Sequence, residues 1–207
     1  TIPSEVGPPA GQTDPNWAAF SPLQKSSAVY DDFGRPIETR QMSAADVVSG
    51  VQQTSYDAAG RVTCTAVRMN PSTFGALPSS ACTAATTGGF GPDRITGVTY
   101  DVADRPLSVT TAYGTGDAQP QSQTYTVGGQ LASFTDGKGN VSLFEYDGFN
   151  RQVKLRYPNA TGGGTSTTDY EQTVYDAVGR PYSARNRAGG LAYFGYDALV
   201  RLVTPHL

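Results

Sequence analysis

The sequence has few lysines, a single histidine and no long apolar run. Its 207 residues include three lysines (Lys25, Lys138 and Lys154) and one histidine, His206. No apolar stretch approaches the roughly 20 residues that a membrane helix requires. The net charge is −3 and no basic stripe is present, which argues against a nucleic-acid partner. We therefore expect no membrane span and no nucleic-acid binding.

Motifs of common catalytic and metal sites are also missing. There is no nucleophile elbow, no Walker loop and no cluster of metal ligands. His206 lies beside the C-terminus, where we expect an exposed side chain rather than a catalytic base. The segment 136–140 reads Asp-Gly-Lys-Gly-Asn but lacks the other carboxylates of a calcium loop, so we expect a tight turn. We predict no enzyme activity, no catalytic or metal-binding residue and no cofactor.

The chain begins at Thr1 rather than at a methionine, and no signal peptide is visible. We interpret it as a processed product or as part of something longer. Two cysteines, Cys64 and Cys82, bracket a segment rich in Pro, Ser and Ala. A disulfide between them would stabilise such an insertion by about 3 kcal/mol in an exported protein. The alternative is a pair of buried thiols. A zinc site is not expected, because two cysteines do not fill a zinc coordination shell.

What the chain does have is a repeated cassette. Seven times a tyrosine opens a turn-like unit, and six of the units read Tyr-Asp-x-x-x-Arg, whereas the seventh, at Tyr125, is degenerate. A unit that recurs this often indicates a repeat architecture rather than a single active site. The six complete units are Tyr30, Asp31, Gly34, Arg35; Tyr56, Asp57, Gly60, Arg61; Tyr100, Asp101, Arg105; Tyr146, Asp147, Arg151; Tyr175, Asp176, Gly179, Arg180; and Tyr196, Asp197, Arg201.

The three residues between Asp and Arg have the composition of a hairpin loop. Aspartate suits the first position of a type I turn, and a left-handed residue at the third loop position would close the turn with a G1 bulge. Gly, Asp or Asn, which tolerate positive φ, occupies that position in five units. Val200 does not fit, so we expect a distorted turn or a frayed end there. This geometry places Asp opposite Arg as a cross-strand ion pair.

The degenerate unit supports the pairing, because it has lost both charges together. Thr126 stands in place of the aspartate and Gln130 in place of the arginine, while Gly129 is kept. Six copies of the Asp–Arg pair point to a structural pair, since a glycosidase-type site needs two carboxylates at one place.

Apolar residues recur two positions after the arginine, and polar residues often follow them. This period-two alternation is typical of a strand with one buried face. Prolines directly after three arginines should lie at an edge or at a break in strand pairing. The apolar positions are Ile37, Leu107, Val153, Tyr182 and Val203, and the prolines are Pro36, Pro106 and Pro181.

We therefore predict an all-β fold, a meander of antiparallel β-hairpins. A Pro-rich lead-in covers 1–26, with Trp17 and Phe20 as packing anchors, and the repeat array covers 27–207. We expect inserted loops at about 64–94 and 158–169. The cassette tyrosines should pack against their neighbours as a ladder. Carbohydrate binding would then fall to the aromatic residues outside the cassette: Trp17, Tyr113, Tyr157 and Tyr170.

The cassette Tyr-Asp-x-x-Gly-Arg, with a glycine-containing turn before the next tyrosine, resembles the YD repeat of bacterial Rhs-family proteins, which teneurins and ABC-toxin shell subunits share. The resemblance covers about 27–203, and the segment 64–82 resembles an insertion of some bacterial members. It implies a β-sheet strip that spirals into a hollow shell. No self-cleavage motif matches.

The resemblance implies a structural role in a secreted or cell-surface bacterial protein. The strip would enclose a toxin cargo or assemble with other YD-repeat segments, either of the same parent chain or of other copies. The segment has too few repeats for a complete shell, so its strand edges need a partner. A carbohydrate-binding or adhesin module with a glycan ligand is the alternative.

Overall fold

The computed structural model describes residues 23–206, and side-chain surroundings as far as residue 203. Trp17, Phe20 and most of the lead-in predicted for 1–26 lie outside these residues, as do the surroundings of the His206 side chain. Residues 24–26, which we expected in the lead-in, belong to the first strand.

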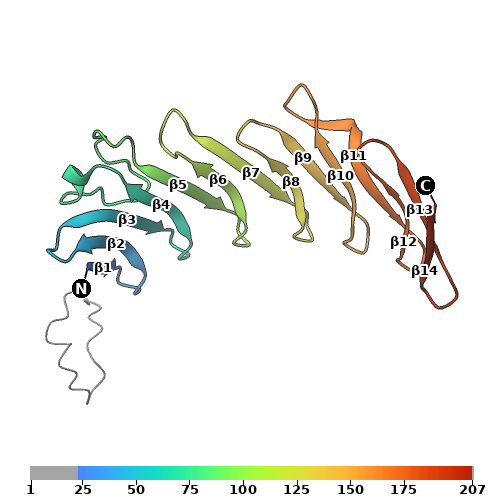
Figure 1. Ribbon diagram of the computed structural model, residues 1–207, viewed down its shortest axis with the longest axis horizontal. Coiled ribbons are helices and arrows are strands. Elements are labelled where there is room, and N and C mark those ends of the chain that lie inside the picture. Colours follow the sequence, from blue (N-terminus) through green and yellow to red (C-terminus); the bar gives the residue numbers. More distant parts are fainter. Residues whose placement is uncertain (1–22, 207) are drawn as a thin grey trace, which may run out of the picture. The chain divides into compact units, whose positions relative to one another are not determined.

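The described chain is a meander of β-strands whose order in the sheet follows the sequence from β1 to β14 (Figure 1). The all-β prediction is confirmed. The strands are β1 Gln24–Tyr30, β2 Pro36–Ser43, β3 Val48–Tyr56, β4 Val62–Arg68, β5 Arg94–Tyr100, β6 Pro106–Thr111, β7 Gln119–Tyr125, β8 Leu131–Thr135, β9 Val141–Tyr146, β10 Gln152–Pro158, β11 Thr165–Tyr175, β12 Pro181–Arg185, β13 Leu191–Tyr196 and β14 Leu202–His206.

The chain divides into two compact units, one ending at Gln119 and the other beginning at Pro120. The first unit contains β1 to β6, and the second contains β8 to β14 together with nearly all of β7. Within each unit, successive strands pair antiparallel. The part of the chain that the structure describes has no helix that is long and apolar enough to cross a membrane.

A register shift lies beside the cassette tyrosine in each hairpin that carries a cassette turn. In the first hairpin Val29 pairs with Glu38, whereas Tyr30 pairs with Pro36. Pro106 and Pro181 occupy the equivalent position opposite their own tyrosines. A proline lacks the N–H that a regular ladder needs, and the bulge is a place where that loss is tolerated. The prediction that these prolines mark breaks in pairing is confirmed.

The long insertion is shorter than the sequence predicted. Strand pairing continues to Arg68 and resumes at Arg94, so the insertion is 69–93, not 64–94. The second loop covers 159–164, not 158–169, because β11 already begins at Thr165. The second boundary was misplaced because threonine and serine, which fill 165–168 and are common in loops, also suit a pleated surface.

A core of buried apolar side chains lies under the insertion. Cys64, Ala66 and Ile95 project from one face of β4 and β5 and pack against Ala81 of the insertion. Val51 of β3 and Phe74, just after a short 3₁₀ helix (Pro71–Thr73), are buried as well. The insertion thus forms a second layer over this part of the first unit.

The expected burial of the alternating apolar positions is wrong for three of them. Leu107, Tyr182 and Val203 are 37%, 52% and 55% exposed. Ile37 and Val153 are half-buried. The alternation does place these residues on a pleated strand, but a single sheet layer buries a face only where something covers it. Within the described residues, only the 69–93 insertion provides such a cover.

Candidate functional site: the repeated Asp–Arg turn

The cassette turn closes with two backbone hydrogen bonds. In the second cassette, the N–H of Asp57 donates to the carbonyl of Arg61 at 2.9 Å, and the N–H of Gly60 donates to the carbonyl of Asp57 at 3.0 Å. The other complete cassettes contain the same two bonds, and so does the degenerate one. The repeat is therefore one local structure that forms from each five-residue segment.

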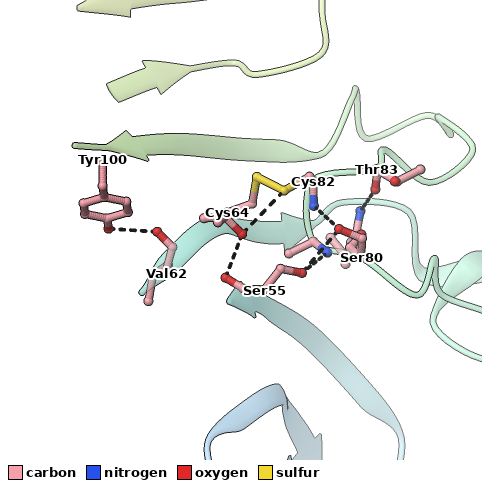
Figure 2. The surroundings of a disulfide bond; sticks show 10 residues. Ser55, Val62, Cys64, Ser80, Cys82, Thr83 and Tyr100 are labelled. Carbon is pink, nitrogen blue, oxygen red and sulfur yellow. Dashed lines mark hydrogen bonds between the residues drawn. A yellow bond between two sulfur atoms is a disulfide. The ribbon is translucent and has the colours of Figure 1, made fainter. Parts of the chain in front are cut away.

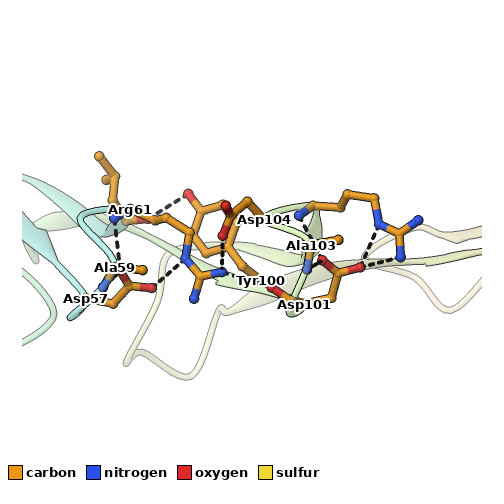
Figure 3. A network of polar contacts seen from close by, with 9 residues as sticks. Asp57, Ala59, Arg61, Tyr100, Asp101, Ala103 and Asp104 are labelled. Carbon is orange, nitrogen blue, oxygen red and sulfur yellow. Dashed lines mark hydrogen bonds and ion pairs between the residues drawn. The ribbon is translucent and has the colours of Figure 1, made fainter. Parts of the chain in front are cut away.

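The aspartate carboxylate fills the inside of the turn (Figure 3). Oδ1 of Asp57 accepts hydrogen bonds from the N–H groups of Ala59 and Arg61, both at 2.9 Å. Oδ2 accepts from Nε of Arg61 at 2.7 Å. The predicted Asp–Arg pair is thus present, but the aspartate also caps two backbone donors, which the sequence interpretation did not include. One carboxylate satisfies the loop and orients the arginine.

These contacts keep the carboxylates ionised. In four of the cassettes the hydrogen bond from the arginine backbone N–H is the largest cause that lowers the pKa of the aspartate below its ordinary value of 3.8. For Asp147 the largest cause is the hydrogen bond from the Arg151 side chain. A general acid needs a raised pKa, so these aspartates are unsuited to that role.

The arginine also reaches the tyrosine of the next cassette. The guanidinium of Arg35 lies 4.5 Å from the ring centroid of Tyr56, and that of Arg61 lies 4.9 Å from the ring of Tyr100. The pairs Arg151–Tyr175 and Arg180–Tyr196 repeat the contact at 4.0 and 4.5 Å. Stacking of a cation on an aromatic face contributes about 0.5–1 kcal/mol at exposed sites.

The same tyrosine is held by its hydroxyl group. The hydroxyl of Tyr100 donates to the carbonyl of Val62 at 2.8 Å (Figure 2), and that of Tyr56 donates to Pro36 at 3.1 Å. In both cases the acceptor directly follows the arginine on which the ring stacks. Each of these rings therefore packs against the arginine of the preceding cassette, whereas we expected the tyrosine rings to pack against one another as a ladder. Sequence spacing alone does not show which residue of one hairpin meets the next.

The turn conformation agrees with the prediction in its φ angles. Gly34, Gly60 and Gly179 have φ of 75°, 86° and 89°, and Asp104 and Asn150 both have 63°. The expected distortion at Val200 is wrong. Val200 takes φ of 64°, and its turn keeps both closing bonds at 3.0 Å. The turn imposes the left-handed conformation on a β-branched residue, which strains the backbone of Val200 but leaves the hydrogen bonds of the turn intact.

The degenerate turn keeps its shape with neutral groups. The Thr126 hydroxyl donates to the side-chain oxygen of Gln130, and the Gln130 N–H donates back to the Thr126 hydroxyl oxygen at 3.1 Å. A related five-residue turn lies between β8 and β9, where Asp136 caps Lys138 and Asn140. The tight turn predicted at 136–140 is confirmed, and its carboxylate is engaged by the turn itself.

The disulfide between Cys64 and Cys82 forms, which excludes the alternative of two thiols (Figure 2). A buried ion pair that the sequence interpretation missed holds the insertion at a second place. Nη1 of Arg68 lies 2.7 Å from Oδ2 of Asp93, and their side chains are 0% and 3% exposed. Arg68 also donates to Gln53 and to the carbonyls of Ser80 and Thr83. Neither residue stands in a motif, so no sequence signal distinguished this pair.

The candidate sugar-binding aromatics have neighbours on their rings. The Arg187 guanidinium lies 3.8 Å from the ring centroid of Tyr157, and that of Arg185 lies 3.8 Å from the ring of Tyr170. Burial, followed by the negative charge of Glu171, raises the pKa of Tyr157. The ring of Tyr113 packs against Gly97, where an added Cβ would lie 2.6 Å away. The residues that the structure describes include no group of three or more His, Cys, Asp or Glu able to hold a metal ion.

One stretch of the chain matches a protein-family model. The model described as RHS Repeat matches 125–161, the stretch that runs from the degenerate cassette through the Asp147–Arg151 turn. These residues form an RHS repeat. No curated protein sequence matches the chain.

The chain is also similar to solved structures, one of which shares its fold. The crystal structure of TcdB2-TccC3-Cdc42 matches with a TM-score of 0.50 at 15% identity, over 88% of this chain and 8% of that chain. The crystal structure of TcdB2-TccC3 without its hypervariable C-terminal region matches with a TM-score of 0.45 at 15% identity, over 88% and 12% of the two chains. A Photorhabdus luminescens Tc holotoxin pore matches with a TM-score of 0.45 at 14% identity, again over 88% and 12%. The chain thus spans only a small part of the length of the protein chains that it matches.

Proposed function

We propose that the chain is a non-catalytic RHS-repeat wall segment of a larger secreted or surface protein. Its hairpins build a β-sheet shell or strip that encloses a polypeptide cargo such as a toxin or assembles with further repeats. The observation that carries this proposal is the link between hairpins, in which an arginine pairs with its own turn and stacks on the next tyrosine. In a repeat protein each unit contacts its neighbours, and four of the arginines make this contact with the tyrosine of the next cassette.

The charged groups of the cassette are already engaged in these contacts within the turn and between hairpins. The Asp176 carboxylate accepts hydrogen bonds from Val178 and Arg180, and the Arg180 guanidinium faces the Tyr196 ring. An acid–base pair for catalysis needs groups that remain able to exchange a proton with a substrate. A structural role explains why the same arrangement recurs, and an active site does not.

The shared fold supports the shell as the larger assembly. The chain covers 8% of the TcdB2-TccC3-Cdc42 chain that it matches, so a complete object of that kind contains many more strands than this segment. We propose a secreted or cell-surface location for the parent by the same likeness. The carbohydrate-binding alternative is less favoured, because arginines already stack on Tyr157 and Tyr170.

The test is the size and form of the native protein. An antibody raised against this segment would isolate the parent from its source for mass determination and electron microscopy. We expect a chain several times longer than 207 residues and a hollow particle whose cargo resists protease until the wall is opened. A mature protein of this length that binds a glycan array through Tyr157 or Tyr170 would refute the proposal.

A further inference from the structure

The cassette turns of the second unit carry exposed apolar side chains at their tips. Each of these turns, 126–130, 147–151, 176–180 and 197–201, has such a side chain at its second or third position. They are Val127, Phe149, Val178 and Leu199, with exposures of 111%, 82%, 74% and 73%. The turn does not require them, since the closing bonds use only its first, fourth and fifth residues. Turn tips are usually Gly, Asn, Asp or Ser.

The turns on the other edge of the same unit have a different character. In a meander, alternate turns lie on opposite edges of the sheet. The turns 136–140, 159–164 and 186–190 expose Lys138, Thr161 and Arg187 at their tips, with small residues beside them. Among the turn residues of this unit, the exposed large apolar side chains therefore lie at one edge, the row of cassette turns, which we name the cassette edge. Apolar side chains gathered on one surface mark an interaction site.

The charge balance of the cassette turns limits the kinds of partner that this surface can bind. Each of the three complete cassettes in this unit holds one carboxylate against one guanidinium, at distances of 2.7 Å. The fourth turn has the neutral pair Thr126 and Gln130. The cassette edge thus has no net charge from its pairs. Nothing on it attracts an anionic lipid surface or a nucleic acid, and nothing on it repels a like edge.

The spacing between successive turns at the cassette edge further limits the kinds of partner that fit. Turns on one edge recur every second strand, which is about 9.6 Å for strands about 4.8 Å apart. A partner with the same period is a second run of the same hairpins. The turn side chains of the second copy would fit between those of the first copy. In a two-fold symmetric dimer the same surface of each copy forms the interface, so the surface must be complementary to itself. We propose that the cassette edge of 120–207 is a self-association surface that binds the same edge of a second copy of this chain.

The size of the surface sets the expected strength. Four tip side chains bury less than the ~800 Å² per partner of a standard stable interface, so the association is weak and depends on concentration. Within an assembly of repeats, tethering raises the effective concentration of the second edge. The proposal thus deepens the structural function and rests on it for its biological setting.

The test is sedimentation equilibrium of the intact chain up to its solubility limit. The edge variant carries Val127→Thr, Val178→Thr and Leu199→Asn, while Phe149 is left unchanged because its ring lies against Arg151. The control variant carries Ala160→Ser and Ala188→Ser on the opposite edge. We expect the wild type and the control to associate equally and the edge variant to have at least a tenfold higher dissociation constant. Equal association of all three, or a wild type that stays monomeric, would overturn the proposal.

Two further measurements keep the result interpretable. The thermal midpoint of the edge variant should equal that of the wild type, because the changed side chains are exposed; Val127→Thr alone provides a second reading if the triple variant melts early. Flotation with phosphatidylcholine vesicles tests a lipid occupant. Flotation of the wild type that the edge variant loses would overturn the proposal in favour of a membrane. Failure of self-association leaves the test on the native parent protein unaffected, so the two proposals fail separately.

Discussion

Arg151 joins two successive hairpins of the second unit. Its Nε lies 2.7 Å from Oδ2 of Asp147 in its own turn, and its guanidinium carbon lies 4.0 Å from the ring centroid of Tyr175 in the next hairpin. A charge held in place by a carboxylate loses less side-chain entropy when it stacks. The turn and the contact between hairpins therefore depend on each other, which is the basis of the structural role proposed for the repeat.

Acid should weaken the fold through the turn carboxylates. Their pKa is lower in the folded chain than the ordinary 3.8. A carboxyl of this kind contributes its stability fully above the unfolded pKa and loses it as the pH falls through the folded pKa. We expect the urea midpoint to be flat above about pH 5 and to fall below pH 4. Asp57→Asn should lower the midpoint at pH 7 and flatten the acid slope, and an unchanged slope would contradict the assignment.

Two glycines with the same conformation should respond differently to alanine. Gly34 and Gly179 both have positive φ, but an added Cβ meets nothing within 4 Å at Gly34, whereas at Gly179 it lies 2.9 Å from Nη1 of Arg151. Gly34→Ala should destabilise by about 1–2 kcal/mol from backbone strain alone. Gly179→Ala should cost more, because it also displaces the arginine from Tyr175. Equal losses in chemical denaturation would show that this arginine is free to move away without loss.

The strained valine should be improved by glycine. Val200 has φ of 64°, a conformation that a β-branched residue rarely adopts. Val200→Gly should raise the free energy of unfolding by about 1 kcal/mol. Val178→Gly in the preceding turn is the matched control, because Val178 is not among the residues with positive φ and should lose stability. A loss of stability at both positions would refute the strain.

The buried ion pair should matter far more than an exposed one. Asp93→Ala leaves Arg68 buried without its partner and should destabilise the first unit by about 3–5 kcal/mol. Lys25→Ala removes the exposed pair with Asp46, in which the Lys25 and Asp46 side chains are 38% and 68% exposed, and should cost less than about 1 kcal/mol. Hydrogen exchange across 69–93 would follow the opening of the insertion. Similar small losses of stability for both variants would contradict the claim that the buried Arg68–Asp93 pair holds the insertion in place.

The sequence was informative where one residue decides a local geometry. Asp57, Gly60 and Arg61 predict the turn, because each has a specific role in a type I turn with a bulge. Cys64 and Cys82 predict the disulfide for a similar reason. These inferences need only neighbouring residues and known backbone preferences.

The contacts across hairpins were harder to predict. The stacking of Arg35 on Tyr56 and the buried pair Arg68–Asp93 join residues that are far apart in sequence. Nothing in a strand pattern says which side chains meet across two strands once bulges shift the register. Burial was overestimated at Leu107 and Tyr182, because alternation shows that a strand has two faces and not that either face is covered.

The most direct test of the structural account is a double-mutant cycle between Arg151 and Tyr175. Arg151→Lys and Tyr175→Leu, alone and together, would be compared by chemical denaturation of the whole chain. We predict a coupling energy of about 0.5–1 kcal/mol. Arg201→Lys combined with Tyr175→Leu is the control and should give additive losses, since the arginine that stacks on the Tyr175 ring is Arg151, whereas Arg201 pairs with Asp197. Additive losses for Arg151 and Tyr175 as well would contradict the claim that the arginine fastens one hairpin to the next.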